Sequence, residues 1–122
     1  DITGFGLLGH AFEMADGSGV TLELESGRVP VLEEAAAYAR KGILTGADAR
    51  NRRFLEGRIE VASSVDAARL SVFFDAQTSG GMFVAVPASR SADLVSRLEA
   101  AGVLACRVGR VLERGEKPLR VL

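Results

Sequence analysis

The sequence predicts an α/β fold in which a mixed sheet is flanked by helices. Three observations support this prediction. Segments with helical spacing of apolar residues alternate with segments of strand period, glycines follow several of the helical segments, and 122 residues suffice for one hydrophobic core. We therefore expect a single domain over residues 1–122.

The first part of the chain predicts two helices around a strand. Apolar residues at helical spacing indicate a helix over residues 4–15, with Thr3 placed to cap it. Strict alternation over residues 20–25 indicates a strand with one face toward solvent. Pro30 suits the start of a further helix over residues 31–41.

The middle of the chain is less regular. Residues 43–57 follow neither period and carry Arg50, Arg52 and Arg53, so we expect a solvated loop there, of a length that is often functional. A short strand over 58–62 and a helix over 64–74 follow.

The last part predicts a strand, a helix and a hairpin. MFVAV at residues 82–86 has the content of a buried strand, and Ser89 or Ser91 caps a helix that ends at Gly102. The apolar segments 103–113 and 118–122 flank RGEK, a connection short enough for a terminal hairpin.

Composition argues against several function classes. With 15 basic and 16 acidic residues and a net charge of -1, the chain lacks the basic excess of a nucleic-acid-binding domain. No apolar run approaches membrane-spanning length, which favours a cytoplasmic protein. The one cysteine, Cys106, lies in a strand-like pattern and is expected to be buried, while His10 is expected to be structural.

Two motifs carry candidate chemistry. In QTSGG, residues Gln77 to Gly81, two hydroxyls and two glycines suit backbone amides that hold a phosphate, although a plain helix-to-strand turn explains the same residues. In DITGFG, Asp1 is a hard oxygen ligand that suits Mg²⁺, or else an ordinary capping aspartate. The glycines at 4, 6 and 9 do not make a dinucleotide fingerprint, because no strand precedes them.

Three phrases together point to one family. DITGFGLLGH, TGADARNRRFLE and FFDAQTSGGMFVAVP, in this order, resemble the C-terminal domain of selenophosphate synthetase over nearly the whole chain. The sequence departs from the family phrase at Ala76, where Pro is usual, and at Met82 and Phe83, where Leu-Leu is usual. The resemblance implies an α/β domain with partial ferredoxin-like topology, as in aminoimidazole ribonucleotide synthetase.

The resemblance also implies an activity for a longer parent. The family phosphorylates selenide with ATP and Mg²⁺, giving selenophosphate, AMP and orthophosphate. Its reactive Cys or selenocysteine, the partner Lys and most ATP contacts belong to an N-terminal region that is absent here, so this piece alone is expected to be inactive. The parent is expected to be a homodimer.

The resemblance assigns residues as well. Asp1 matches a family metal-binding aspartate, Thr3 and Gly4 would support its turn, and Gln77, Thr78, Ser79, Gly80 and Gly81 match the family's glycine turn, a candidate phosphate or domain-interface element. Two alternatives stay open: a domain of another ATP-using synthetase of the same superfamily, and a non-catalytic anion-binding or structural module.

Overall fold

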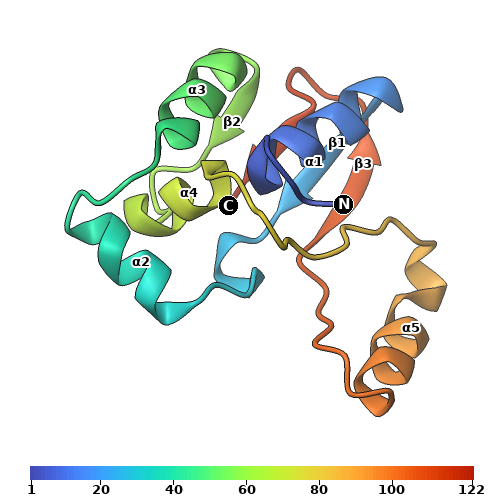
Figure 1. The fold of residues 1–122 in the computed structure, drawn as a ribbon. Helices are drawn as coiled ribbons and strands as arrows, with labels where there is room; N and C mark the ends of the chain where they lie inside the picture. Colours follow the sequence, from blue (N-terminus) through green and yellow to red (C-terminus); the bar gives the residue numbers. More distant parts are fainter.

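A computed structural model describes residues 1–122 and contains one mixed four-stranded sheet (Figure 1). The strand order is β2-β4-β1-β3, where β1 pairs parallel with β4 and antiparallel with β3, and β4 pairs parallel with β2. The strands are β1 (Val20–Leu24), β2 (Ile59–Val61), β3 (Gly109–Glu113) and β4 (Leu119–Val121). The predicted α/β class with a mixed sheet is confirmed.

Five α-helices accompany the sheet. They are α1 (Gly6–Gly17), α2 (Glu33–Arg40), α3 (Gly46–Leu55), α4 (Ala67–Phe74) and α5 (Ala88–Ala100), with a short 3₁₀ helix at Ser26–Arg28. The helices predicted over residues 4–15, 31–41 and 64–74 and the helix ending at Gly102 are confirmed, with shifted ends. The predicted caps are wrong: Phe5, not Thr3, precedes α1, and Ser89 and Ser91 lie inside α5. No helix combines the length and the apolar character needed to cross a bilayer.

The core lies between the sheet and α1, α3 and α4. Leu8, Leu119 and Val121 have no exposed surface, and they pack with further buried apolar side chains of β1, α3 and α4. Burying each such side chain contributes about 1.5–3 kcal/mol relative to exposure. α1 packs on β1 and β4 and also contacts α3 and α4, so the start of the chain is anchored near the centre of the domain.

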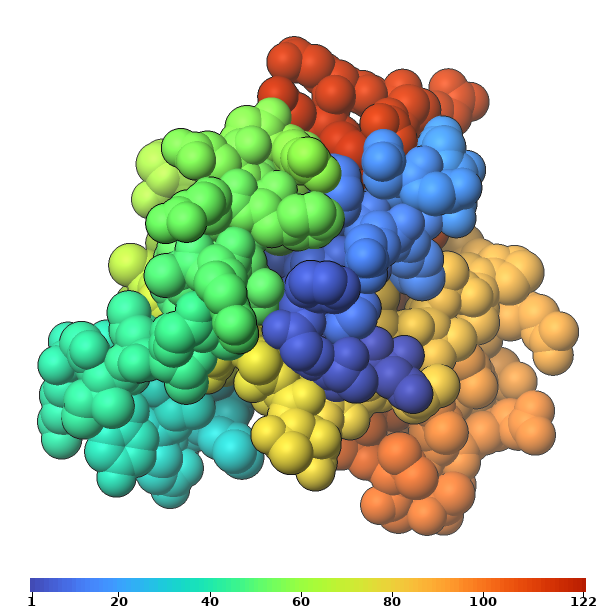
Figure 2. All heavy atoms as spheres, turned by 45° about the horizontal axis from the view of Figure 1, so that its top comes forward, coloured from blue at the N-terminus to red at the C-terminus, as the bar shows by residue number.

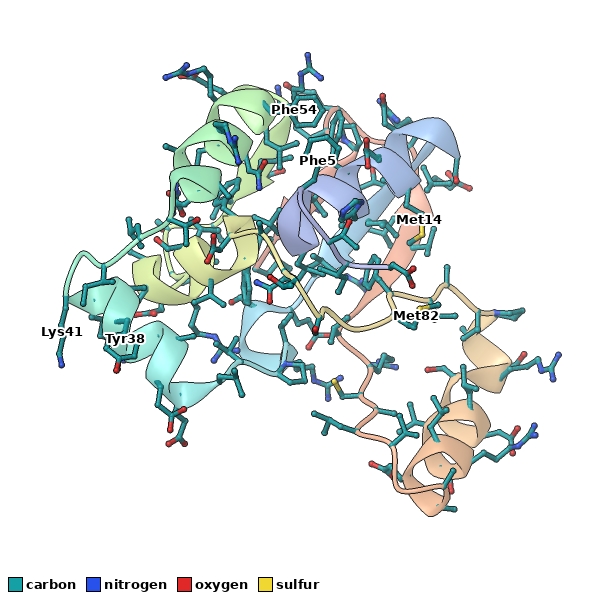
Figure 3. The ribbon with its side chains drawn as sticks, in the orientation of Figure 1. Phe5, Met14, Tyr38, Lys41, Phe54 and Met82 are labelled. Atoms are coloured by element: carbon teal, nitrogen blue, oxygen red, sulfur yellow. The ribbon has the colours of Figure 1, made fainter.

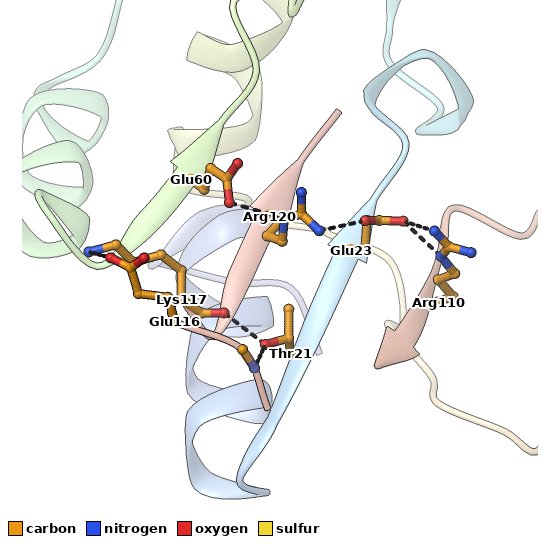
Figure 4. A network of polar contacts seen from close by, with 8 residues as sticks. Thr21, Glu23, Glu60, Arg110, Glu116, Lys117 and Arg120 are labelled. Atoms are coloured by element: carbon orange, nitrogen blue, oxygen red, sulfur yellow. Dashed lines mark hydrogen bonds and ion pairs between the residues drawn. The ribbon is translucent and has the colours of Figure 1, made fainter. Parts of the chain in front are cut away.

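A row of charges crosses the four strands (Figure 4). The Glu23 carboxylate, although only 5% of the residue is exposed, accepts hydrogen bonds from Arg110 Nε at 2.7 Å and from an Arg120 terminal nitrogen at 3.2 Å. Arg120 Nε donates to Glu60 at 3.0 Å. A buried carboxylate is tolerated here because two guanidinium groups pair with it.

The loop predicted over residues 43–57 is wrong, because most of it is α3. Thr45 caps this helix by accepting a hydrogen bond from the Ala47 backbone N–H at 3.1 Å. The buried side of α3 includes the polar residues Asp48 and Asn51 beside Ala47 and Leu55. This polar content hid the helical period of apolar residues.

The strand predicted at residues 82–86 and the terminal hairpin are also wrong. Residues 82–86 belong to no strand, and Met82 is 73% exposed. Instead, β4 lies between β1 and β2, and β1 separates β4 from β3. The C-terminal segment therefore takes the central position in the sheet that a buried strand needs.

The segment around α5 extends away from the rest of the domain (Figure 1). No residue of α5 is buried. Cys106, which follows α5, is exposed and precedes β3, so its predicted burial in a strand is wrong; its Sγ lies 3.6 Å from the Arg28 carbonyl oxygen.

Candidate functional site

Two glycine-containing turns from distant parts of the sequence meet beside α1. The Ile2 backbone N–H donates to the Gly81 carbonyl at 3.0 Å, and the Gln77 N–H donates to the Thr3 carbonyl at 2.9 Å. In Figure 2 the first residues lie between α3 and the residues that follow α4. The DITG turn (Asp1–Gly4) and the QTSGG turn (Gln77–Gly81) thus form one structural unit, which we call the turn junction.

The two turns lie so close together that position 80 has room only for glycine. A Cβ atom at this position would lie 2.0 Å from the Ile2 carbonyl oxygen, a distance that no side chain allows. Neither Gly80 nor Gly81 has a positive φ, so the backbone conformation does not require glycine at either position. The first role of Gly80 is contact with the DITG turn.

Gly6 joins the same unit from the start of α1. Its φ is +67°, and a Cβ would lie 2.7 Å from the carbonyl oxygens of Phe73 and Asp75. Both the backbone conformation and the packing exclude a side chain here. The N-terminus of α1 therefore rests on the C-terminus of α4.

Asn51 of α3 joins the DITG turn to the end of α4. This side chain is buried, and its amide nitrogen donates to the Phe74 carbonyl at 2.7 Å and to the Gly4 carbonyl at 3.1 Å. Nearby, the Thr45 hydroxyl donates to the Asp75 carboxylate, which also accepts from the Ala76 N–H at 2.9 Å. The third phrase quoted from the sequence thereby contacts the other two.

Asn51, Thr45 and Asp75 are absent from the residues selected by sequence reasoning. The signal that could have found α3 is the pattern Thr-x-x-Asp at residues 45–48, which is typical of a helix start. With α3 recognised as a helix, a polar residue on its inward side would have indicated a buried hydrogen-bond donor.

Several groups at the turn junction face solvent without partners. Thr78 and Ser79 are exposed, and their hydroxyls make no hydrogen bond within the chain. The backbone N–H groups of residues 78–81 also donate no hydrogen bond to the chain. These donors can receive an anionic oxygen atom from outside the domain.

Asp1 is exposed at the start of the same unit. Its carboxylate suits Mg²⁺, but no group of three or more His, Cys, Asp or Glu side chains in the chain could hold a metal ion. One carboxylate from this domain fits a magnesium site only if other ligands come from elsewhere.

His10 and the arginines of α3 complete the surroundings. His10 Nε2 is hydrogen-bonded to the Thr3 hydroxyl at 3.0 Å, and its Nδ1 lies 3.2 Å from the Glu13 carboxylate, so His10 supports the DITG turn. Arg52 Nε donates to Asp48 at 2.8 Å and a terminal nitrogen donates to Ser71 at 2.9 Å, which makes Arg52 a structural residue. Arg50 and Arg53 are exposed.

Comparison with known families shows to which family this chain belongs. The family model described as AIR synthase related protein, C-terminal domain, matches residues 1–121. This chain belongs to that family. Three curated relatives show which proteins this AIR synthase related domain is similar to.

The first relative is selenide, water dikinase 2 of Peptoclostridium acidaminophilum, 42% identical over 100% of this chain and 35% of the relative. Selenide, water dikinase of Clostridioides difficile (strain 630) is 37% identical over 100% of this chain and 35% of the relative. That of Porphyromonas gingivalis is 46% identical over 84% of this chain and 29% of the relative.

The AIR synthase related domain therefore spans about a third of the length of these relatives. The resemblance drawn from the three phrases is confirmed, because selenide, water dikinase is another name for selenophosphate synthetase. The three phrases that carry it are those that meet at the turn junction.

Proposed function

We propose that this AIR synthase related domain is the C-terminal part of a selenophosphate synthetase. The parent makes selenophosphate from selenide and ATP and releases AMP and orthophosphate. The parent is a cytoplasmic homodimer in this proposal, and its N-terminal part supplies the nucleophile, most ATP contacts and the remaining metal ligands.

The turn junction supports this proposal most strongly. Asp1 and the QTSGG turn, which the family resemblance singles out, are brought together by the two backbone hydrogen bonds from Ile2 and Gln77. Gly80, Gly6 and Asn51 fix this arrangement through backbone contacts and a buried side chain. A preorganised unit of this kind suits phosphoryl transfer, where positioning and charge neutralisation supply most of the catalysis.

Each exposed group has a role in the proposed reaction. Asp1 contributes one negative oxygen ligand to a Mg²⁺ cluster whose other ligands belong to the N-terminal part. Mg²⁺, when bound, neutralises charge on the ATP phosphates. The Thr78 and Ser79 hydroxyls and the free amides of residues 78–81 orient a phosphate oxygen or the surface that holds it.

Two substitutions in the full-length parent test the proposal. Asp1→Ala should lower selenide-dependent AMP formation by at least tenfold and raise the Mg²⁺ concentration needed, with Asp1→Asn rescuing partly because it keeps an oxygen ligand but loses the charge. Ser79→Ala should raise the KM for ATP several-fold, since it removes one donor with little change in volume.

Ser89→Ala is the matched control, because Ser89 is also exposed but lies on α5, away from the turn junction. It should leave turnover and KM unchanged. If Asp1→Ala retains wild-type activity throughout a Mg²⁺ titration, Asp1 is not a metal ligand. If Ser79→Ala behaves as Ser89→Ala does, the Ser79 hydroxyl has no part in the reaction.

A further inference from the structure

An exposed aromatic pair lies beside the turn junction. Phe5 is 45% exposed and Phe54 is 36% exposed, and their rings stack with centroids 5.8 Å apart and an interplanar angle of 20° (Figure 3). Phe5 follows the DITG turn directly, and Phe54 lies in the last turn of α3. Two large apolar side chains are therefore presented together on the face that carries the turn junction.

This aromatic pair is held in place by its neighbours. Phe54 packs edge-on against Phe12 with centroids 5.9 Å apart, and Phe5 contacts the His10 ring at 5.6 Å. A Cβ at Gly9 would lie 2.5 Å from the Phe5 Cβ, so the absence of a side chain at Gly9 lets Phe5 settle against α1. A fixed apolar surface loses little conformational entropy when another surface covers it.

Three arginines of α3 and the residues that follow it form no ion pair within the chain. The Arg58 guanidinium lies 5.0 Å from the Phe54 ring centroid, and Arg50 precedes Phe54 by one helical turn on α3. Arg50, Arg53 and Arg58 are exposed, and none of them forms a salt bridge within the chain. The surface thus combines an apolar centre with a basic rim, as protein interfaces do.

We propose that the aromatic pair, with Arg50, Arg53 and Arg58, is the docking surface for the N-terminal part of the same parent chain. This inference rests on the proposed function. The occupant follows from the length of the relatives, of which about two thirds lies outside the match, and from Phe5, which directly follows the DITG turn that the proposed function places against the N-terminal part. Its contacting surface carries apolar groups for the rings and carboxylates for the arginines.

Thiol labelling of the full-length parent tests the docking surface. In a Cys106→Ser background, Phe54→Cys is compared with Val86→Cys, because Phe54 and Val86 are both 36% exposed in the domain. A maleimide reagent is added, and the labelled peptides are quantified by mass spectrometry. We expect Phe54→Cys to react at least tenfold more slowly than Val86→Cys; rates within threefold of each other overturn the proposal.

A second matched pair guards against a folding defect at Phe54. Phe5 and Val103 are 45% and 49% exposed, and the same slow reaction is expected at Phe5→Cys relative to Val103→Cys. If both Phe→Cys positions react as fast as their controls once the parent is diluted a hundredfold, a second copy of the chain covers the pair. The proposal is then overturned. Selenide-dependent AMP formation by the wild-type parent is measured separately, and its absence would contradict the proposed function without changing the labelling rates.

Discussion

Replacing Asn51 with Ala should lower the free energy of unfolding of the domain by more than most single substitutions do. The substitution removes the buried hydrogen bond to the Phe74 carbonyl and the part-buried bond to the Gly4 carbonyl. Losing the first leaves a buried acceptor unsatisfied, at about 2 kcal/mol, and the second adds about 1 kcal/mol because water can reach the Gly4 carbonyl. The free energy of unfolding should fall by about 3 kcal/mol, and Tm by roughly 10 °C.

Urea denaturation of the 122-residue chain, followed by circular dichroism, measures this effect. Arg50→Ala is the matched control, since Arg50 is the preceding residue of α3, exposed and without an ion pair; it should change the free energy of unfolding by less than about 0.5 kcal/mol. If Asn51→Ala changes stability no more than Arg50→Ala, Asn51 does not hold the turn junction and the account of it is wrong.

Two further predictions follow from the turn junction and from the missing part of the parent. Gly80→Ala should destabilise the chain by at least about 2 kcal/mol, because its Cβ would meet the Ile2 carbonyl, whereas Gly81→Ala, with no atom within 4 Å of its Cβ, should be nearly neutral; equal urea midpoints for the two variants would refute this. The purified 122-residue chain should fold but form no AMP from ATP and selenide, because the proposed function places the nucleophile and most ATP contacts in the N-terminal part; measurable turnover would contradict this.

The sequence predicts those elements whose buried side is apolar. β1 was predictable because its residues alternate, although the prediction that one face meets solvent is wrong, since Thr21 and Glu23 are 2% and 5% exposed. α1 was predictable because Leu8, Ala11 and Ala15 recur at helical spacing. α3 was not predicted, because its inward side carries the polar residues Asp48 and Asn51. Hydrogen bonds, not apolar contacts, satisfy these side chains in the interior.

The order of strands required information that local patterns lack. Residues 82–86 and 119–121 are both apolar segments suited to the centre of the sheet, and their local content does not decide which one pairs with β1. In the structure β4 takes this position, with Leu119 and Val121 fully buried. Strand pairing is a long-range outcome, and a short apolar run carries no information about its partner.

The candidate site was predictable in part. The phrases containing Asp1 and Gln77 to Gly81 were selected from the sequence, but their contact depends on hydrogen bonds between residues far apart in the chain. The need for glycine at position 80 also comes from this contact, which only the folded chain reveals. Asn51 was not selected from the sequence as a site residue, because an asparagine in an arginine-rich segment resembles a surface residue.

The most direct test of the proposed function is the product formed by the full-length parent. With selenide, ATP and Mg²⁺, ³¹P nuclear magnetic resonance should show selenophosphate and orthophosphate accumulating in step with AMP, one of each per ATP consumed. Asp1→Ala should abolish most of this signal while the domain retains its fold. ADP as the product, or ATP consumption that does not depend on selenide, would contradict the assignment of this domain to a selenophosphate synthetase.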